Sequence, residues 1–196
     1  MAELRLLDVS NTQENPMPIR HVTRTFADGD FARLGTGADG GLLRLIAGVE
    51  RMESGTIFLG GRKISGLPAP QRRVGILFAR HPLYLNRTAA ENLRAGLRIS
   101  ASAAAEAALA FGAERLLTVN ARELTAEQRL YVGLARLLLQ SPEVILLETP
   151  LRFLPAPSRP AAWSAIRRLH ALTGATVLCS MSAAEKEILD FTADKA

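Results

Sequence analysis

The first eighty residues alternate between apolar and polar positions in short runs that are typical of strands. An Asp-Gly turn at 28–29 separates two of these runs, and a Gly-Gly turn at 60–61 interrupts another. The run 74–78 is apolar throughout, which favours a fully buried parallel strand. We expect strands at 3–10, 19–26, 31–34, 55–66 (broken by its turn) and 74–78. An apolar helix is predicted over 42–49, after a glycine-rich loop.

Helical periodicity dominates the following sixty residues. Thr88 with Glu91, and Thr125 with Gln128, have the spacing of a capping box, so helices are predicted to begin just after each threonine. Further helices are expected at 100–117, 161–172 and 183–193, and buried strands at 143–148 and 173–180. Strands that alternate with helices in this order predict an α/β fold with a mainly parallel sheet.

Composition is compatible with one folded domain, because 48% of the 196 residues are apolar and 22% are charged. The net charge of +5 comes from arginine, since Lys63, Lys186 and Lys195 are the only lysines. The positive excess lies mainly between residues 44 and 98. No nucleic-acid-binding motif accompanies it, so we interpret it as a solvated face and expect no nucleic-acid partner.

Cysteine content and hydropathy indicate the cellular compartment that we expect for the protein. Cys179 is the only cysteine, which excludes an intramolecular disulfide, and its apolar neighbours place it in a buried strand. No signal region is apparent, and no segment has the roughly 18 uninterrupted apolar residues of a membrane span. We therefore expect a cytoplasmic protein that docks on a membrane protein without entering the lipid.

The stretch LGTGADGGLLRLIAG, at 34–48, has the rhythm of a phosphate-binding loop that runs into a helix. Such a loop reads G-x-x-x-x-G-K-[ST]: its backbone N–H groups and lysine hold phosphates, and its hydroxyl holds Mg²⁺. No lysine follows any glycine here. The loop therefore has the glycines of a phosphate-binding loop but lacks the lysine that binds phosphate.

Three further stretches complete a pattern: GVERMESGTIFLGGRKISGLPAPQRRVGILF, HPLYLNRTAAENLRAGL and RELTAEQRLYVGLARLLLQSPEVILLETPL. In this order and spacing, the chain from residue 1 to about 192 resembles the ATP-binding subunits of ABC transporters, nearest to the sugar-importer type. The resemblance implies a P-loop NTPase-like core with a mainly parallel sheet, a small antiparallel β subdomain near the N-terminus and an inserted helical subdomain. We expect a single domain over 1–196, with its core at 1–80 and 140–196, its helical subdomain at about 81–139, and the family's last strands missing.

The resemblance also implies where each catalytic position falls, and most of these positions have changed. Asp39 stands where the family has the P-loop lysine, and Gly40 and Gly41 replace the two hydroxyl residues. Ala79 replaces the Q-loop glutamine. In the segment corresponding to the LSGGQ signature, Thr125 retains a hydroxyl, but Glu127 takes the place of a glycine.

The last catalytic positions have changed as well. Glu148 and Thr149 occupy the Walker B positions of the Mg²⁺-ordering aspartate and the general-base glutamate, and Ser182 aligns with the switch histidine. A charge about 4 Å from a phosphate contributes roughly 4 kcal/mol at an effective dielectric of 20, so replacing lysine by Asp39 removes several decades of ATP affinity. The sequence therefore favours a non-catalytic interaction or regulatory subunit that needs no cofactor.

An alternative remains open: a residual nucleotide-binding subunit that pairs with a competent ATPase. The residues that would support ATP and Mg²⁺ binding under this alternative are Gly35, Gly37, Gly40, Gly41 and Thr125.

Leu83, Tyr84 and Leu85 keep the apolar character of a region that, in the family, receives a helix of the transmembrane subunit. They could instead pack the helical subdomain. The partners that the resemblance implies are a transmembrane permease subunit or a competent ABC ATPase, in a heterodimer or a homodimer, at the periphery of the inner membrane.

Overall fold

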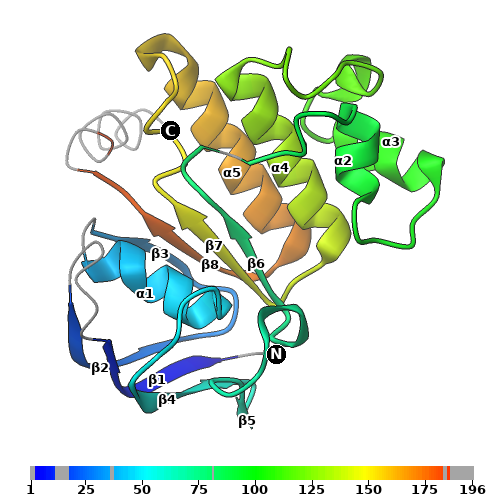
Figure 1. Cartoon of the computed structure of the whole chain (residues 1–196). Coiled ribbons are helices and arrows are strands. Elements are labelled where there is room, and N and C mark those ends of the chain that lie inside the picture. The colour runs from blue at the N-terminus through cyan, green and yellow to red at the C-terminus, as the bar shows by residue number, and fades with distance from the viewer. Residues whose placement is uncertain (1–2, 12–17, 36–37, 81, 183–184, 186–196) are drawn as a thin grey trace. The chain divides into compact units, whose positions relative to one another are not determined.

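A computed structural model describes residues 3–11, 18–35, 38–80, 82–182 and 185 (Figure 1). The chain divides into two compact units. The first comprises Met1–Ile76, Pro142–Thr149 and Gly174–Ala183, and the second comprises Leu77–Ser141, Pro150–Thr173 and Ala184–Ala196.

The first unit contains an antiparallel sheet of four strands in the order β2-β1-β4-β5. These strands are β1 (Leu4–Asn11), β2 (Ile19–Phe26), β4 (Ser54–Leu59) and β5 (Arg62–Lys63). The β4–β5 pair is the hairpin that the Gly-Gly turn predicts. Leu4, Leu6 and Val9 of β1 are fully buried in the unit's core, which confirms the predicted alternation at the start of the chain.

The pairing of β1 with β2 has two register shifts, on either side of Val9. Asp8 and His21 both adopt left-handed backbone conformations, with φ of 52° and 50°, and the register shifts between Leu6 and Val9. Gly55 of β4 packs closely against this irregular part of β1: a Cβ added to Gly55 would lie 2.5 Å from the carbonyl oxygen of Asp8. With a φ of 97° as well, position 55 requires glycine.

The second sheet has the order β3-β8-β7-β6. Its strands are β3 (Phe31–Leu34), β6 (Val74–Leu77), β7 (Val144–Glu148) and β8 (Thr176–Ser180), and β8 runs parallel to both β3 and β7. Every residue of β8 is buried, including Cys179, as predicted. The expectation of a continuously buried strand at 74–78 is wrong, because β6 lies at the edge of this sheet and only Gly75 and Leu77 are buried.

Helix α1 (Ala38–Ala47) shares one core with both sheets of the first unit, through Leu42, Leu43, Leu45 and Ile46 (Figure 1). It begins four residues before the predicted helix, so the glycine pair belongs to its first turns. Its end is a Schellman motif at Gly48 (φ 76°), where Val49 N–H donates to Arg44 O at 3.1 Å.

Helices form the second unit: α2 (Ala89–Arg94), α3 (Ala101–Leu109), α4 (Ala126–Gln140) and α5 (Arg159–Thr173). Helix α4 packs against each of the other three. Both predicted capping boxes are present, at Thr88 with Glu91 and at Thr125 with Gln128.

Short 3-10 turns connect several of these elements, at Ala69–Gln71, Glu114–Leu116 and Ala156–Ser158. The helix expected over 100–117 is shorter than predicted: it ends at Leu109, and Gly112 (φ 65°) turns the chain away. The helix expected at 183–193 lies outside the described residues apart from Glu185.

Candidate functional site

The glycine-rich stretch contributes its last residues to the start of α1. Asp39, Gly40 and Gly41 fall in the first turns of the helix, Gly35 precedes it, and Gly37 lies outside the described residues. A Cβ added to Gly40 would meet no atom within 4 Å. A serine would therefore fit at this position, so the missing hydroxyl is a chemical change that packing does not explain.

Glu148 and Thr149 stand at the carboxyl end of β7, in the same unit as α1. Thr149 is buried, with a left-handed φ of 40°. Its N–H donates to the carbonyl oxygen and to the hydroxyl of Ser180, both at 3.1 Å. A threonine hydroxyl does not act as a general base at neutral pH, unlike the glutamate that the resemblance implies at this position.

Arg44 of α1 binds Glu148 with a two-pronged contact. Its Nη2 donates to Glu148 Oε1 at 2.8 Å, and its Nε donates to Oε2 at 3.2 Å. A third bond runs from Nη1 to Glu50 Oε1 at 3.1 Å. The hydrogen bond to Glu148 is the main cause that raises the pKa of Arg44, against the opposing effect of burial.

The prediction from sequence missed Arg44, although a signal was present. Arg44 stands four residues after Gly40, and residues with this spacing share one face of a helix. A basic side chain on the face that carries the family's metal hydroxyl is a candidate partner for the Walker B carboxylate.

The resemblance implies a Mg²⁺-nucleotide at this site. Mg²⁺ takes oxygen ligands in octahedral geometry and is usually bound through carboxylates together with substrate phosphates. Here the carboxylate of Glu148 is held by a guanidinium, and Gly40 offers no hydroxyl. The residues present do not fit the Mg²⁺-nucleotide.

The signature-like segment lies at the start of α4, in the second unit. Thr125 Oγ1 accepts the N–H of Gln128 at 3.2 Å, and Gln128 Oε1 accepts the N–H of Thr125 at 2.9 Å. Glu127 is half-buried and accepts a bond from the Tyr131 hydroxyl at 2.7 Å. Burial and this bond raise the pKa of Tyr131 to about 12. These polar groups are thus engaged within their own helix.

Two further predicted positions are half-buried. Ala79 is half-buried in a turn after β6, in the second unit, and offers only a methyl group. Ser182 follows β8 in the first unit and is also half-buried.

The predicted partner groove contains two exposed residues. Tyr84 is 49% exposed and Leu85 is 50% exposed, whereas Leu83 is half-buried. The fully buried Asn92 fixes this segment: its Oδ1 accepts the N–H of Tyr84 at 2.7 Å, and its Nδ2 donates to the carbonyl oxygen of Tyr84 at 3.1 Å. About half of the surface of Tyr84 and of Leu85 thus remains open to solvent, while the Tyr84 ring also contacts the Arg136 guanidinium, 5.9 Å from the ring centroid.

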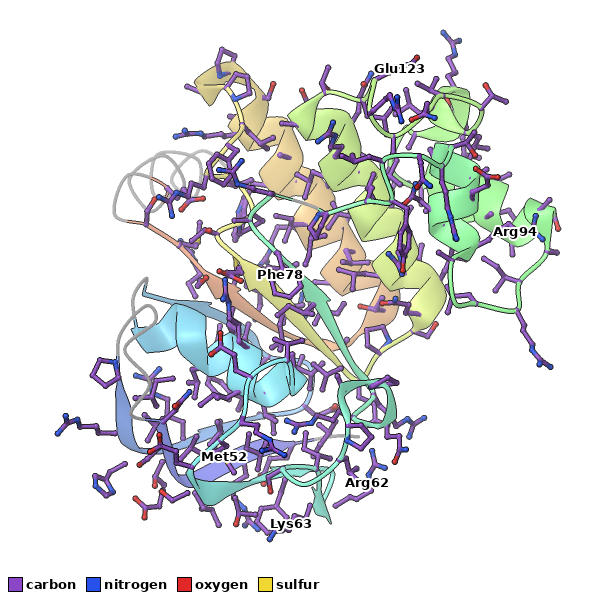
Figure 2. All side chains as sticks on the ribbon, in the orientation of Figure 1. Met52, Arg62, Lys63, Phe78, Arg94 and Glu123 are labelled. Carbon is purple, nitrogen blue, oxygen red and sulfur yellow. The ribbon has the colours of Figure 1, made fainter. Side chains whose placement is uncertain are left out.

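A hollow of about 460 Å³ lies in the same segment of the chain, lined by Arg87, Glu91, Arg94, Ala95, Gly96 and Leu97 (Figure 2 labels Arg94). The Arg87 guanidinium stacks on the Tyr84 ring, 4.8 Å from its centroid. Bonds from Thr88 lower the pKa of Glu91, so that this carboxylate stays ionised. Two arginines against one glutamate leave the hollow positively charged.

Residues 40–152 match the family model of ABC transporters, which is more than half of the chain, and the protein therefore belongs to the ABC transporter family. The chain is similar to the sn-glycerol-3-phosphate import ATP-binding protein UgpC of several bacteria. It is 32% identical to that of Paracoccus denitrificans over 189 residues, covering 91% of this chain and 53% of the relative. For Burkholderia ambifaria the identity is 33%, with coverages of 90% and 52%. For Rhizobium meliloti it is also 33%, with coverages of 90% and 54%.

The chain spans about half the length of the curated relatives it matches. The family match confirms the resemblance drawn from the motifs, and the mixed α/β architecture with its parallel and antiparallel sheets confirms the expected fold class. In the part of the chain that the structure describes, no helix is both long enough and apolar enough to cross a bilayer.

Proposed function

We propose that this protein is a non-catalytic member of the ABC transporter family, which acts through protein contacts as an interaction or regulatory subunit of a membrane transport complex. The observation that carries the proposal is the two-pronged contact between Arg44 and Glu148, with Thr149 in place of the base behind it.

Hydrolysis in this family needs a carboxylate that orders Mg²⁺ and a second one that activates water. The first is bound to a guanidinium here, and a threonine occupies the position of the second. Asp39 adds a negative charge where the family has a lysine. These changes all lower affinity for a phosphate-bound metal, and they support a protein that neither hydrolyses ATP nor needs it as a cofactor.

The partner surface that we propose consists of Tyr84, Leu85, Arg87 and Arg94, which we call the docking surface. It offers two half-exposed apolar side chains beside a positively charged hollow. This combination suits an apolar segment that carries an acidic group. We propose a transmembrane permease subunit or a competent ABC ATPase as the partner, and the cytoplasmic side of the inner membrane as the location.

The proposed division into a core at 1–80 and 140–196 and a helical subdomain at about 81–139 follows from the same family resemblance. In the structure, α5 groups with the helices of the second unit.

Residual nucleotide binding is the alternative. It would rest on Gly35, Gly37, Gly40, Gly41 and Thr125. The use of the Thr125 hydroxyl as a helix cap and the carboxylate of Glu127 two residues later weigh against it.

Purification of the tagged full-length protein from native membranes in mild detergent, followed by mass spectrometry, tests the proposal. The expected result is that a permease subunit or an ABC ATPase comes with it. A Leu85→Ser variant should lose that partner, because truncating a central interface residue costs about 2 kcal/mol, roughly 30-fold in affinity.

The matched control is Leu109→Ser, which changes a 63% exposed leucine at the end of α3 and should keep the partner. Recovery of a monomer alone at full yield would contradict the proposed function. Equal recovery of the partner with both variants would contradict the docking surface.

A further inference from the structure

Arg44 lies between two carboxylates of the first unit. Its Nη2 and Nε bind Glu148, and its Nη1 binds Glu50. The side chains are partly shielded from solvent: Arg44 is 33% exposed, Glu50 is 23% exposed and Glu148 is 17% exposed. With two negative charges and one positive charge, the group needs its cation to remain stable.

The geometry differs from that of an ordinary surface ion pair. An exposed pair with one contact contributes little, whereas a fork-shaped contact to a carboxylate is both stronger and more specific in direction. The arginine is also attached to the same fold through α1, so its effective concentration at Glu148 is that of an intramolecular group. A divalent ion from solution would have to displace this guanidinium from Glu148.

We infer that Arg44 is the resident cation of Glu148: its guanidinium neutralises the Walker B carboxylate in place of Mg²⁺ and closes that carboxylate to divalent ions. The inference deepens the proposed function, because it names the group that keeps the metal position shut. Removing Arg44 would leave the carboxylates of Glu50 and Glu148 without this guanidinium, so that both could attract a divalent ion.

Binding of MnCl₂ to the purified full-length protein, followed by electron paramagnetic resonance of free Mn²⁺, tests this inference. The wild type and the Glu148→Gln variant should show the same weak background binding. Arg44→Gln should gain a site that binds Mn²⁺ at least about tenfold more tightly than this background, since Mn²⁺ favours carboxylate oxygens. The double variant Arg44→Gln/Glu148→Gln should lose that site again.

Thermal unfolding provides a second readout. Arg44→Gln leaves two shielded carboxylates without a cation, so its Tm should fall by about 4–8 °C. MnCl₂ should restore part of that loss, and NaCl at the same ionic strength should restore less. Arg62→Gln, which removes an exposed arginine from β5, is the matched control and should leave both Tm and Mn²⁺ binding unchanged.

Two results would overturn the inference. One is Mn²⁺ binding by the wild type that Glu148→Gln abolishes, and the other is a folded Arg44→Gln variant without a gain in Mn²⁺ binding. Should Arg44→Gln fail to fold, Arg44→Lys takes its place: it keeps one charge without the fork, and it should bind Mn²⁺ more tightly than the wild type. An unchanged Arg44→Lys variant would also overturn the inference. Neither assay depends on recovery of a membrane partner, so this inference and the proposed function can fail separately.

Discussion

Arg72 joins the end of α1 to the chain that follows the β4–β5 hairpin, and its replacement should destabilise the first unit strongly. The side chain is 6% exposed. Its Nη1 donates to the carbonyl oxygens of Leu45 and Ile46 at 2.7 and 3.0 Å, in the last turn of α1. Its Nε and Nη2 donate to the carbonyl oxygens of Leu67 and Ser65 at 2.8 and 3.1 Å. Burial lowers the pKa of Arg72, which reflects the opposing penalty of desolvation.

The magnitude follows from these contacts. A hydrogen bond to a charged group contributes about 1.5–3 kcal/mol, but the desolvation of Arg72 offsets part of the gain from its four bonds. Arg72→Met leaves backbone carbonyl oxygens without the donors of the guanidinium, and a buried acceptor left unsatisfied costs about 1–3 kcal/mol, so we expect a net loss of about 3–5 kcal/mol. For a chain of 196 residues, that loss corresponds to a fall in Tm of roughly 10 °C.

Arg72→Met tests this expectation, because methionine retains most of the side-chain stem without the donors. Thermal unfolding followed by circular dichroism gives the Tm, and urea unfolding gives the free energy. Arg62→Met is the matched control, because Arg62 (labelled in Figure 2) is exposed and donates to Gln71 O at 3.3 Å; this change should shift stability by less than about 0.5 kcal/mol. Equal losses in the two variants would refute the reasoning.

Three further predictions concern other parts of the chain. Asp39→Lys alone should produce no ATP turnover in a phosphate-release assay, because the general base is missing as well; measurable turnover would contradict this. The raised pKa of Tyr131, about 12 against an ordinary value of 10.0, means that the folded protein keeps a proton that the unfolded chain loses. The free energy of unfolding should therefore fall as the pH rises between these two values. Glu127→Gln should lower the pKa of Tyr131 in an ultraviolet titration. An unchanged pKa would show that the bond has no effect. Gly55→Ala should lower the free energy of unfolding by more than about 2 kcal/mol, because backbone atoms block the position of the new Cβ. Gly61→Ala meets no neighbour and should lower it by about 1 kcal/mol. Equal losses in urea unfolding would contradict the steric argument.

Local signals made much of the fold predictable from the sequence. The caps at Thr88 and Thr125 each depend on a partner three residues away, so the sequence pattern contains the whole interaction. The strand 19–26 was predicted with the bounds that the structure gives. The glycine pair hid the true start of α1, because glycine disfavours helices locally while the core contacts of Leu42 and Leu43 hold this one in place.

Long-range features were not predictable in the same way. Arg44 and Glu148 are separated by 104 positions, so the helical spacing of Arg44 from Gly40 marks it as a candidate but does not give the two-pronged contact. The edge position of β6 is likewise a property of the sheet order, which the apolar run at 74–78 does not encode. Family resemblance placed Glu148 at the end of a strand correctly. The contact of its carboxylate with Arg44 of α1 depends on the folded arrangement of α1 and β7.

The central claim is that the inherited nucleotide site does not hold Mg-ATP, and a thermal shift titration of the full-length protein with Mg-ATP tests it most directly. A ligand at 100 times its Kd stabilises a protein by about 2.7 kcal/mol, which is roughly 5–10 °C in Tm at this chain length. The account predicts no shift with millimolar Mg-ATP beyond that caused by MgCl₂ with an equal amount of inorganic phosphate. A concentration-dependent rise in Tm that Glu148→Gln abolishes would contradict it.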